Sequence, residues 1–285
     1  MREKAFFFGA HGTLFGILTE PNGTRDAVRP AVILLNAGVV HRIGPHRKSV
    51  KLARSLADQG FSVFRFDLAG LGDSEPRRDA LSFEEGAVSD VKEAMDHLQK
   101  MGAATRFLLM GLCSGADMSF QTTCRDERVV GAIMMDGYSY PTPEYHVRRF
   151  VQRARTVRSW RAFGLRKARE LMHRWKHGPS EKAPLPTGPI RQYVREFPPK
   201  ERFISDLKHL VGRGVFMHFV YSGGMPEYYN YERQFADALA GVHFGDHVTS
   251  EMFPTANHTF TELAEQEALV AAAVKWTVRR FGSAG

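Results

Sequence analysis

The sequence is poor in cysteine: Cys113 and Cys124 are the only two among 285 residues. They stand eleven positions apart on one predicted helix, a separation of about 16 Å at 1.5 Å per residue. This exceeds the roughly 7 Å limit for the Cα atoms of a disulfide. A disulfide-stabilised secreted scaffold is therefore excluded, and we expect a cytoplasmic protein with free thiols.

Long apolar runs are also missing. No stretch approaches the roughly 18–20 continuous apolar residues of a membrane span, so we expect none. The apolar part of the first residues, 5–8, is too short for a signal peptide. The chain has no internal repeat and no nucleic-acid-binding motif. We therefore expect a globular enzyme or binding protein, without a metal, a cofactor or a nucleic-acid partner.

Acidic residues are scarce in one segment. Residues 139–214 contain 18 Lys and Arg against 6 Asp and Glu, whereas the remainder contains 21 against 25. The net charge of +8 therefore comes from this segment. Its basic residues alternate with apolar ones at helical spacing, which indicates amphipathic helices with solvated basic faces.

Apolar runs that alternate with helical patterns fill the rest of the chain, which predicts a mostly parallel sheet covered by helices on both faces. The first two strands are expected to form an antiparallel hairpin. Expected strands are 5–8, 14–19, 31–35, 61–66, 107–110, 129–135, 214–220 and 248–253, and expected helices are 46–59, 83–101 and 262–281.

Residues 111–116 read Gly-Leu-Cys-Ser-Gly-Ala, between an expected strand and an expected helix. A strand that turns sharply into a helix, with small residues two before and two after a nucleophile, is a nucleophile elbow. Centring the pattern on Cys113 puts Gly111 and Gly115 at the two crowded positions. Centring it on Ser114 would put Leu112 at one of them, so the spacing selects Cys113 as the nucleophile.

Three further segments follow other expected strands: Asn-Ala-Gly at 36–38, Asp-Leu-Ala-Gly-Leu-Gly-Asp-Ser at 67–74, and Ala-Asn-His-Thr-Phe at 256–260. With the elbow, and in this order, they resemble the motifs of the α/β-hydrolase superfamily. The resemblance implies an α/β-hydrolase core at 1–138 and 215–285, with a basic helical cap at 139–214 inserted after the sixth strand. Within the 67–74 segment, we expect Asp67 and Asp73 to fix the turn.

The site residues follow from these positions. The positive end of a helix and a nearby histidine would lower the pKa of Cys113, and His258 is the candidate general base. Two residues are candidates for the acid that partners His258. Asp136 ends the sixth strand, and Glu227 follows the seventh strand and precedes His258 by 31 residues. Either carboxylate would hold His258 in the required tautomer.

The resemblance places the oxyanion hole at the backbone amides of Ser114 and of either Gly38 or Val39. Asn36 stands where many relatives have a histidine. His41 and His46 flank the same loop, and either binds substrate or is solvated. Asp117, in the first turn of the elbow helix, is expected to match the helix dipole, and Cys124 is expected to be an inert packing residue.

Cysteine in place of serine gives a thioester intermediate, which stays activated for transfer when water is kept out. The elbow resembles those of dienelactone hydrolases, which hydrolyse, and polyhydroxyalkanoate synthases, which transfer acyl chains. It also looks like hydrolases associated with exosortase and exopolysaccharide loci. We therefore predict an acyl-transfer enzyme acting on a thioester or ester, with an acidic acyl carrier protein as a candidate partner of the basic cap. The alternatives are an esterase or thioesterase, and a non-catalytic binding protein.

Overall fold

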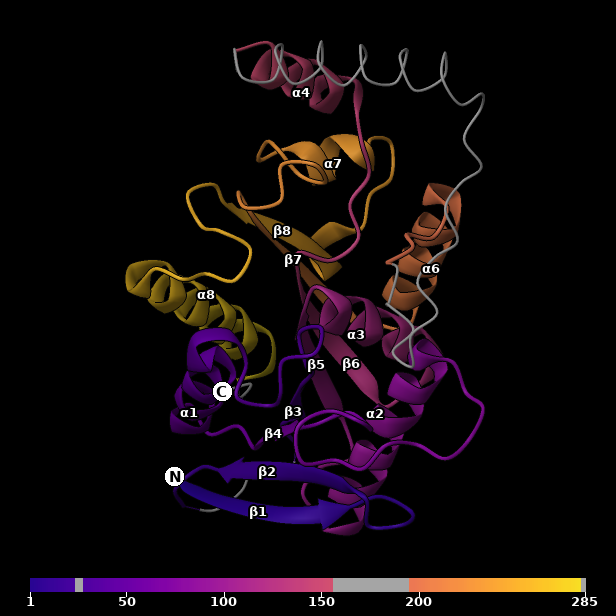
Figure 1. The fold of residues 1–285 in the computed structure, drawn as a ribbon, viewed down its shortest axis with the longest axis vertical. Helices are drawn as coiled ribbons and strands as arrows, with labels where there is room; N and C mark the ends of the chain where they lie inside the picture. The colour runs from indigo at the N-terminus through magenta and orange to yellow at the C-terminus, as the bar shows by residue number, and fades with distance from the viewer. Residues whose placement is uncertain (24–27, 156–194, 283–285) are drawn as a thin grey trace, which may run out of the picture.

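In a computed structural model, which describes residues 1–23, 28–155 and 195–282, eight strands form one sheet of order β1-β2-β4-β3-β5-β6-β7-β8 (Figure 1). β2 runs antiparallel to both neighbours, β1 and β4. β4, β3, β5, β6, β7 and β8, which follow β2 in the sheet, are parallel to one another. The strand bounds are β1 (Arg2–Phe8), β2 (Leu14–Glu20), β3 (Ala31–Leu34), β4 (Val63–Phe66), β5 (Phe107–Leu112), β6 (Val129–Met135), β7 (Phe216–Ser222) and β8 (Val248–Phe253).

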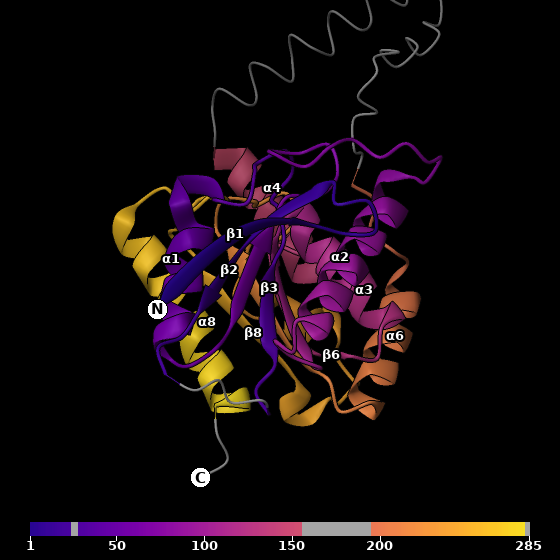
Figure 2. The ribbon, with the colours of Figure 1, turned by 90° about the horizontal axis from the view of Figure 1, so that it is seen from below.

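Helices cover both faces of this sheet, as Figure 2 shows from below. α1 and α8 pack on one face, around a core that includes Leu56, Leu108 and Trp276. α2, α3 and α6 pack on the other. The described helices are η1 (Pro45–Arg47), α1 (Lys48–Asp58), α2 (Phe83–Lys100), α3 (Ser114–Arg125), α4 (Pro143–Arg155), α6 (Lys200–Gly212), α7 (Gln234–Ala238), η2 (Gly245–His247) and α8 (Leu263–Phe281).

Local sequence explains why the central elements form. Every residue of β3, β4 and β5 is buried, as expected for parallel strands covered on both faces. α2 begins with a capping box, in which Ser82 Oγ accepts from the Glu85 amide and the Glu85 carboxylate accepts from the Ser82 amide. The fold predicted from the alternating pattern is confirmed, and each expected strand is present with bounds shifted by at most a few residues.

One element differs from the sequence prediction. We predicted that residues 139–214 lie in a cap, but α6, within that range, packs on the sheet. Its buried residues Phe203, Leu207 and Leu210 share a core with β6 and β7. An amphipathic pattern shows that a helix has an apolar face, but it does not show which surface that face covers.

The rest of the predicted cap is described only in part. Residues 156–194, with much of the basic charge and part of the apolar pattern, lie outside the described residues. In α4, which precedes them, Val147, Phe150 and Val151 are exposed.

Within the described ranges, no helix is long and apolar enough to cross a membrane.

Candidate active site

Cys113 forms the turn between β5 and α3, at the carboxyl end of the parallel strands. Its backbone has φ 58° and ψ −119°, a conformation that side-chain-bearing residues rarely adopt and that is typical of strained functional sites. The Cys113 amide donates to the Met135 carbonyl at 2.9 Å, and the Cys113 carbonyl accepts from the Ala116 amide at 3.0 Å. Backbone bonds from both sides therefore hold the turn.

The two glycines that flank this turn allow chain segments to approach closely. A Cβ at Gly111 would lie 2.1 Å from the backbone of Gly115, and a Cβ at Gly115 would lie 2.3 Å from the carbonyl oxygen of Asn36. Neither distance is tolerated by a real Cβ. The requirement for small residues on both sides of Cys113, inferred from spacing, therefore has a direct steric cause.

Asp136 and His258 meet beside this elbow. His258 Nδ1 lies 2.6 Å from Asp136 Oδ2. Asp136 ends β6 with φ 47°, and its carboxylate accepts from the amide and the hydroxyl of Ser222, each at 2.7 Å. Ser222 ends β7, so the adjacent strand fixes the carboxylate that orients His258. Sequence reasoning did not identify Ser222.

The loop that carries His258 also depends on glycine. A Cβ at Gly223 would lie 1.9 Å from the Pro254 carbonyl oxygen, and one at Gly224 would lie 2.2 Å from the amide nitrogen of His258. The Gly-Gly pair after β7 therefore lets the histidine loop after β8 come close to the end of β7. This pair was present in the sequence but did not enter the prediction.

Cys113 and His258 each shift the pKa of the other, so the two side chains lie next to each other. Burial works against the Cys113 thiolate, but the hydrogen bond from His258 and the positive charges of Arg195 and His258 outweigh it, so the pKa of Cys113 is lowered. Hydrogen bonds to Asp136 and Cys113 raise the pKa of His258 to about 9 despite its partial burial. The arrangement therefore favours a thiolate–imidazolium pair.

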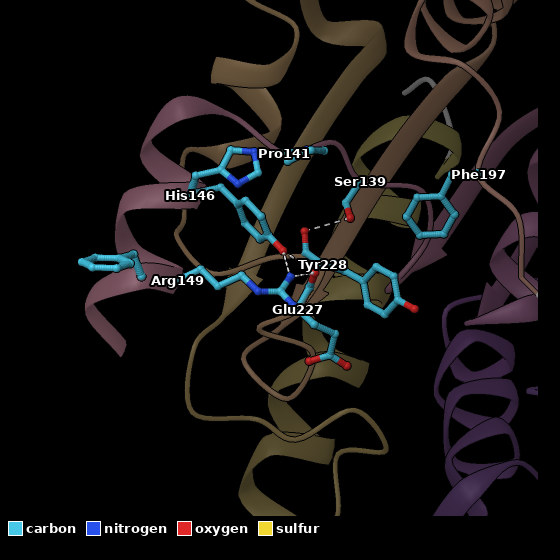
Figure 3. A pocket seen from close by; sticks show the side chains of 9 residues that line it. Ser139, Pro141, His146, Arg149, Phe197, Glu227 and Tyr228 are labelled. Carbon is cyan, nitrogen blue, oxygen red and sulfur yellow. Dashed lines mark hydrogen bonds between the residues drawn. The ribbon is translucent and has the colours of Figure 1, made fainter. Parts of the chain in front are cut away.

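Glu227, the other candidate acid, lies apart from this group. In Figure 3, its backbone carbonyl accepts hydrogen bonds from Tyr145 and from Arg149, the latter at 3.0 Å. It lines a cavity of about 490 Å³ together with Tyr228, Phe197 and residues of α4 and the segment before it. Of the two candidates, Asp136 is the one that contacts His258 among the described residues.

The loop after β3 approaches the first turn of α3. The Gly38 amide donates to Ser114 Oγ at 2.9 Å, while the Ser114 amide contributes to lowering the pKa of the Cys113 thiol. Among the described residues, the amide of Val39 has no acceptor, and its side chain is exposed. Of the amides predicted for the oxyanion hole, that of Gly38 therefore reaches the first residue of α3, where it is already bonded to a hydroxyl.

Asp67 holds this same loop. Its buried carboxylate accepts from the Arg42 amide at 2.6 Å and from the Asp73 amide at 3.1 Å, and it also pairs with the Arg42 guanidinium. Arg42 pairs with Asp73 at 2.6 Å. Asn36 reinforces the link, because its Oδ1 accepts from the Leu68 amide at 3.0 Å. Asp67 thus fixes both its own turn and the loop after β3, and Arg42 is a contributor that sequence reasoning missed.

Asp117 has a partner that the sequence did not predict. Arg195 donates to both of its carboxylate oxygens, at 2.5 and 2.7 Å, and also to the Asp136 carbonyl at 2.8 Å. The Asp117 side chain is fully buried and that of Arg195 nearly so. This ion pair joins the helix of Cys113 to the backbone of Asp136.

The remaining candidates contact other parts of the described structure. His41 is exposed, and its carbonyl accepts from the Gly44 amide at 2.9 Å. His46 is also exposed and lies 3.4 Å from Thr261 Oγ1. Burial raises the pKa of the Cys124 thiol to about 12, as fits a packing residue.

In the described part of the chain, no group of three or more His, Cys, Asp or Glu side chains is placed to hold a metal.

The sheet order, the elbow and the position of the histidine loop define an α/β hydrolase. The chain belongs to the family described as serine aminopeptidase, S33 (Hydrolase_4), whose sequence model matches residues 31–188, more than half of its length. The family description names a serine enzyme, whereas the elbow of this chain carries Cys113. None of the curated proteins compared with the chain matches it.

Solved structures are similar over nearly the whole chain. An esterase of Pyrococcus furiosus has a TM-score of 0.59 at 14% identity, covering 99% of this chain and 91% of that one. A serine hydrolase of Xanthomonas campestris, described as without a lid, has a TM-score of 0.57 at 14% identity, covering 100% and 97%. A cold-adapted esterase from an Arctic intertidal metagenomic library has a TM-score of 0.54 at 14% identity, covering 98% and 93%. At these identities the likeness shows the fold.

Proposed function

We propose that this protein cleaves an ester or thioester through an acyl-thioester intermediate on Cys113. The observation that carries the proposal is the position of His258, whose Nδ1 lies 2.6 Å from Asp136 and whose pKa is raised by both Asp136 and Cys113. Nucleophile, base and orienting acid in this relation are the working parts of acyl transfer. Family membership supports hydrolysis as the overall reaction.

Acylation begins with the Cys113 thiolate. Its sulfur attacks the carbonyl carbon, forming an S–C bond while the carbonyl π electrons move to oxygen. The oxyanion collapses, the carbonyl re-forms, and the bond to the leaving group breaks. The imidazolium of His258 gives its proton to the departing alkoxide or thiolate. Because Nδ1 is engaged by Asp136, Nε2 is the nitrogen that serves Cys113 and the leaving group.

Deacylation reverses these roles. Neutral His258 takes a proton from water as the water oxygen attacks the thioester carbon. The second oxyanion collapses, the S–C bond breaks, and Cys113 leaves as a thiolate beside the imidazolium. The products are a carboxylic acid and the starting enzyme, so protons and electrons balance over the cycle.

A second fate for the acyl group is favoured by the cysteine itself. A thioester is close in energy to the thioester of an acyl carrier, so an acyl-Cys113 remains able to acylate an amine or an alcohol. Transfer then competes with hydrolysis according to which acceptor reaches the intermediate. The same acylation step serves both reactions, and the acceptor decides between them.

Intact-mass spectrometry after mixing with short, medium and long acyl thioesters and p-nitrophenyl esters tests the proposal. We expect the mass of the acyl group on the wild type and on Cys124→Ala, and none on Cys113→Ala. An adduct that persists in Cys113→Ala, or no adduct from any donor, would refute it. Adding amines or alcohols then measures transfer: faster loss of the adduct with a new amide or ester identifies a transferase.

An acidic acyl carrier protein is the donor that the charge distribution favours. Residues 139–214 hold 18 basic and 6 acidic residues, and complementary charge accelerates encounter between proteins. Many of these basic residues fall in 156–194, outside the described residues. On α4, Arg148 is half-exposed although it pairs with Glu144. The proposal is therefore that carrier-bound donors approach from the side of α4.

A further inference from the structure

The Ser114 side chain occupies a distinctive place at the elbow. Ser114 is the first residue of α3, directly after Cys113, and it is 4% exposed. Its amide belongs to the first turn of the helix, where amides have no partner within the helix, and it helps to lower the pKa of the Cys113 thiol. Its hydroxyl accepts the Gly38 amide at 2.9 Å. Two backbone amides are expected at the oxyanion hole. Ser114 supplies one of them, and its hydroxyl accepts a hydrogen bond from the other, that of Gly38.

The hydroxyl hydrogen of Ser114 remains to be placed. Among the described residues, this hydroxyl is found only as an acceptor, in its bond from Gly38. An O–H group that accepts a backbone amide is polarised and becomes a better donor. The loop is held close to α3: Asp67 accepts from the Arg42 amide and pairs with its guanidinium, and the Asn36 carbonyl oxygen packs against Gly115. The hydroxyl therefore contacts the loop from the residue next to Cys113 and has a hydrogen to donate.

We propose that the Ser114 hydroxyl is a side-chain donor of the oxyanion hole: it accepts the Gly38 amide and donates its own hydrogen to the oxygen that becomes negative when Cys113 attacks. This inference rests on the proposed function. The Gly38 amide then acts through the hydroxyl, and the Ser114 amide turns from the sulfur to the oxyanion as the S–C bond forms. The carbonyl oxygen of an ester or thioester thus meets two donors from one residue.

The alternative is that the hydroxyl only fills the hole in the free enzyme and moves aside for substrate, so that the Gly38 amide contacts the oxyanion directly. The two arrangements predict opposite results for Ser114→Ala. Without the hydroxyl, a plugged hole would be open from the start, and acylation would be as fast as in the wild type or faster. A hole that uses the hydroxyl would lose a donor, and acylation would slow.

Two reactions of the same thiol separate this role from a structural one. p-Nitrophenyl acetate acylates Cys113 through an oxyanion, and the burst of p-nitrophenolate reports its rate. Iodoacetamide alkylates Cys113 by direct displacement without an oxyanion, so its rate reports only thiolate fraction and access. Ser119→Ala is the matched control, because it removes a buried hydroxyl from the same helix, where Ser119 donates to the Gly115 carbonyl at 2.8 Å.

For Ser114→Ala we expect acylation to slow by about 10²-fold, as for the loss of one oxyanion donor, with alkylation within about twofold of the wild type. Ser119→Ala should leave the ratio of the two rates unchanged. Acylation of Ser114→Ala at or above the wild-type rate, or an equal fall in both reactions, overturns the inference. A wild type that alkylates at Cys113 but is acylated by none of the esters and thioesters overturns the proposed function, and the inference with it.

Discussion

A cysteine at the elbow changes where the proton resides before substrate arrives. A serine alcohol keeps its proton until a histidine removes it during attack, whereas the contacts of Cys113 lower its pKa and those of His258 raise its pKa to about 9. In the proposed mechanism, the thiolate is thus prepared in advance, and His258 already holds the proton that the leaving group needs. The chemical consequence is that reactivity follows the ionisation of the pair rather than of either residue alone.

Selective alkylation tests this preparation. We expect iodoacetamide between pH 6 and 8 to label Cys113 about 100-fold faster than Cys124 or more, because the thiolate is the reactive form and burial raises the pKa of Cys124 to about 12. Peptide mapping by mass spectrometry measures both rates in one sample. Cys124→Ala should behave as the wild type. Slow labelling at equal rates would contradict an activated Cys113.

The bond between His258 and Asp136 predicts the pH dependence of acylation. The rate should rise with pH as Cys113 ionises and fall as His258 loses its proton near pH 9. In Asp136→Asn, the largest contribution that raises the His258 pKa is lost, so the alkaline limb should move to lower pH. The maximum should also fall by about 10²-fold or more.

The p-nitrophenyl acetate burst measured from pH 5 to 10 for both proteins checks this expectation. Glu227→Gln is the matched control, since Glu227 was the other candidate acid and contacts Tyr145 and Arg149 through its backbone. It should keep the wild-type profile. An alkaline limb that stays in place in Asp136→Asn and moves in Glu227→Gln would reverse the assignment of the acid.

Among the structural elements, strands and amphipathic helices were predictable because their signals are local. The buried runs at 107–110 and 129–135 and the helical spacing at 83–101 depend on neighbours within a few residues. The steric need for Gly111 and Gly115 was also readable, because the elbow is a local turn. Cys113 and His258 followed from their positions after strands.

The contacts that decide between Asp136 and Glu227 as the acid are not local in the sequence. They are those of the Ser222 amide and hydroxyl, which hold Asp136 from the adjacent strand, 86 residues along the chain. The partners of Arg195 and Arg42 lie 78 and 25 residues away. Such contacts are set by sheet order and loop packing, which spacing along one sequence does not reveal. The same limit explains why α6 was placed in the cap.

Lys48 joins two elements at the site. It begins α1 and is 5% exposed, and its amine lies 3.4 Å from the Thr259 carbonyl and 4.7 Å from the centre of the Phe260 ring. Burial lowers its pKa from 10.5 to about 8, with the charge of Asp136 acting in the opposite direction. The histidine loop is thus packed against a buried amine whose charge opposes folding.

The stability difference between the wild type and Lys48→Met should therefore depend on pH. Below about pH 8, both folded and unfolded Lys48 are charged, and burial costs about 3 kcal/mol. As the pH rises from about 8 to 10.5, the folded protein loses this proton while the unfolded chain keeps it, so the wild type gains stability relative to Lys48→Met. Urea unfolding at pH 7 and pH 10.5 measures the change; a pH-independent difference would contradict it.

For the whole molecule, charge is distributed unevenly: residues 139–214 are strongly basic, and the remaining chain has 21 basic against 25 acidic residues. If an acidic acyl carrier protein delivers the acyl group, long-range attraction contributes to its encounter rate. Such attraction is screened as the Debye length falls from about 10 Å at 0.1 M salt to about 3 Å at 1 M. A small neutral ester experiences no such attraction.

We therefore expect kcat/KM for a carrier-bound donor to fall about tenfold or more between 0.05 and 0.5 M NaCl, while kcat/KM for p-nitrophenyl acetate stays nearly constant. Arg148→Glu, on α4, should weaken the carrier reaction at low salt. Arg78→Glu makes the same charge change at a 93% exposed side chain before α2 and should have a smaller effect. Equal salt dependence for the two donors would mean that the basic segment does not serve to attract a carrier.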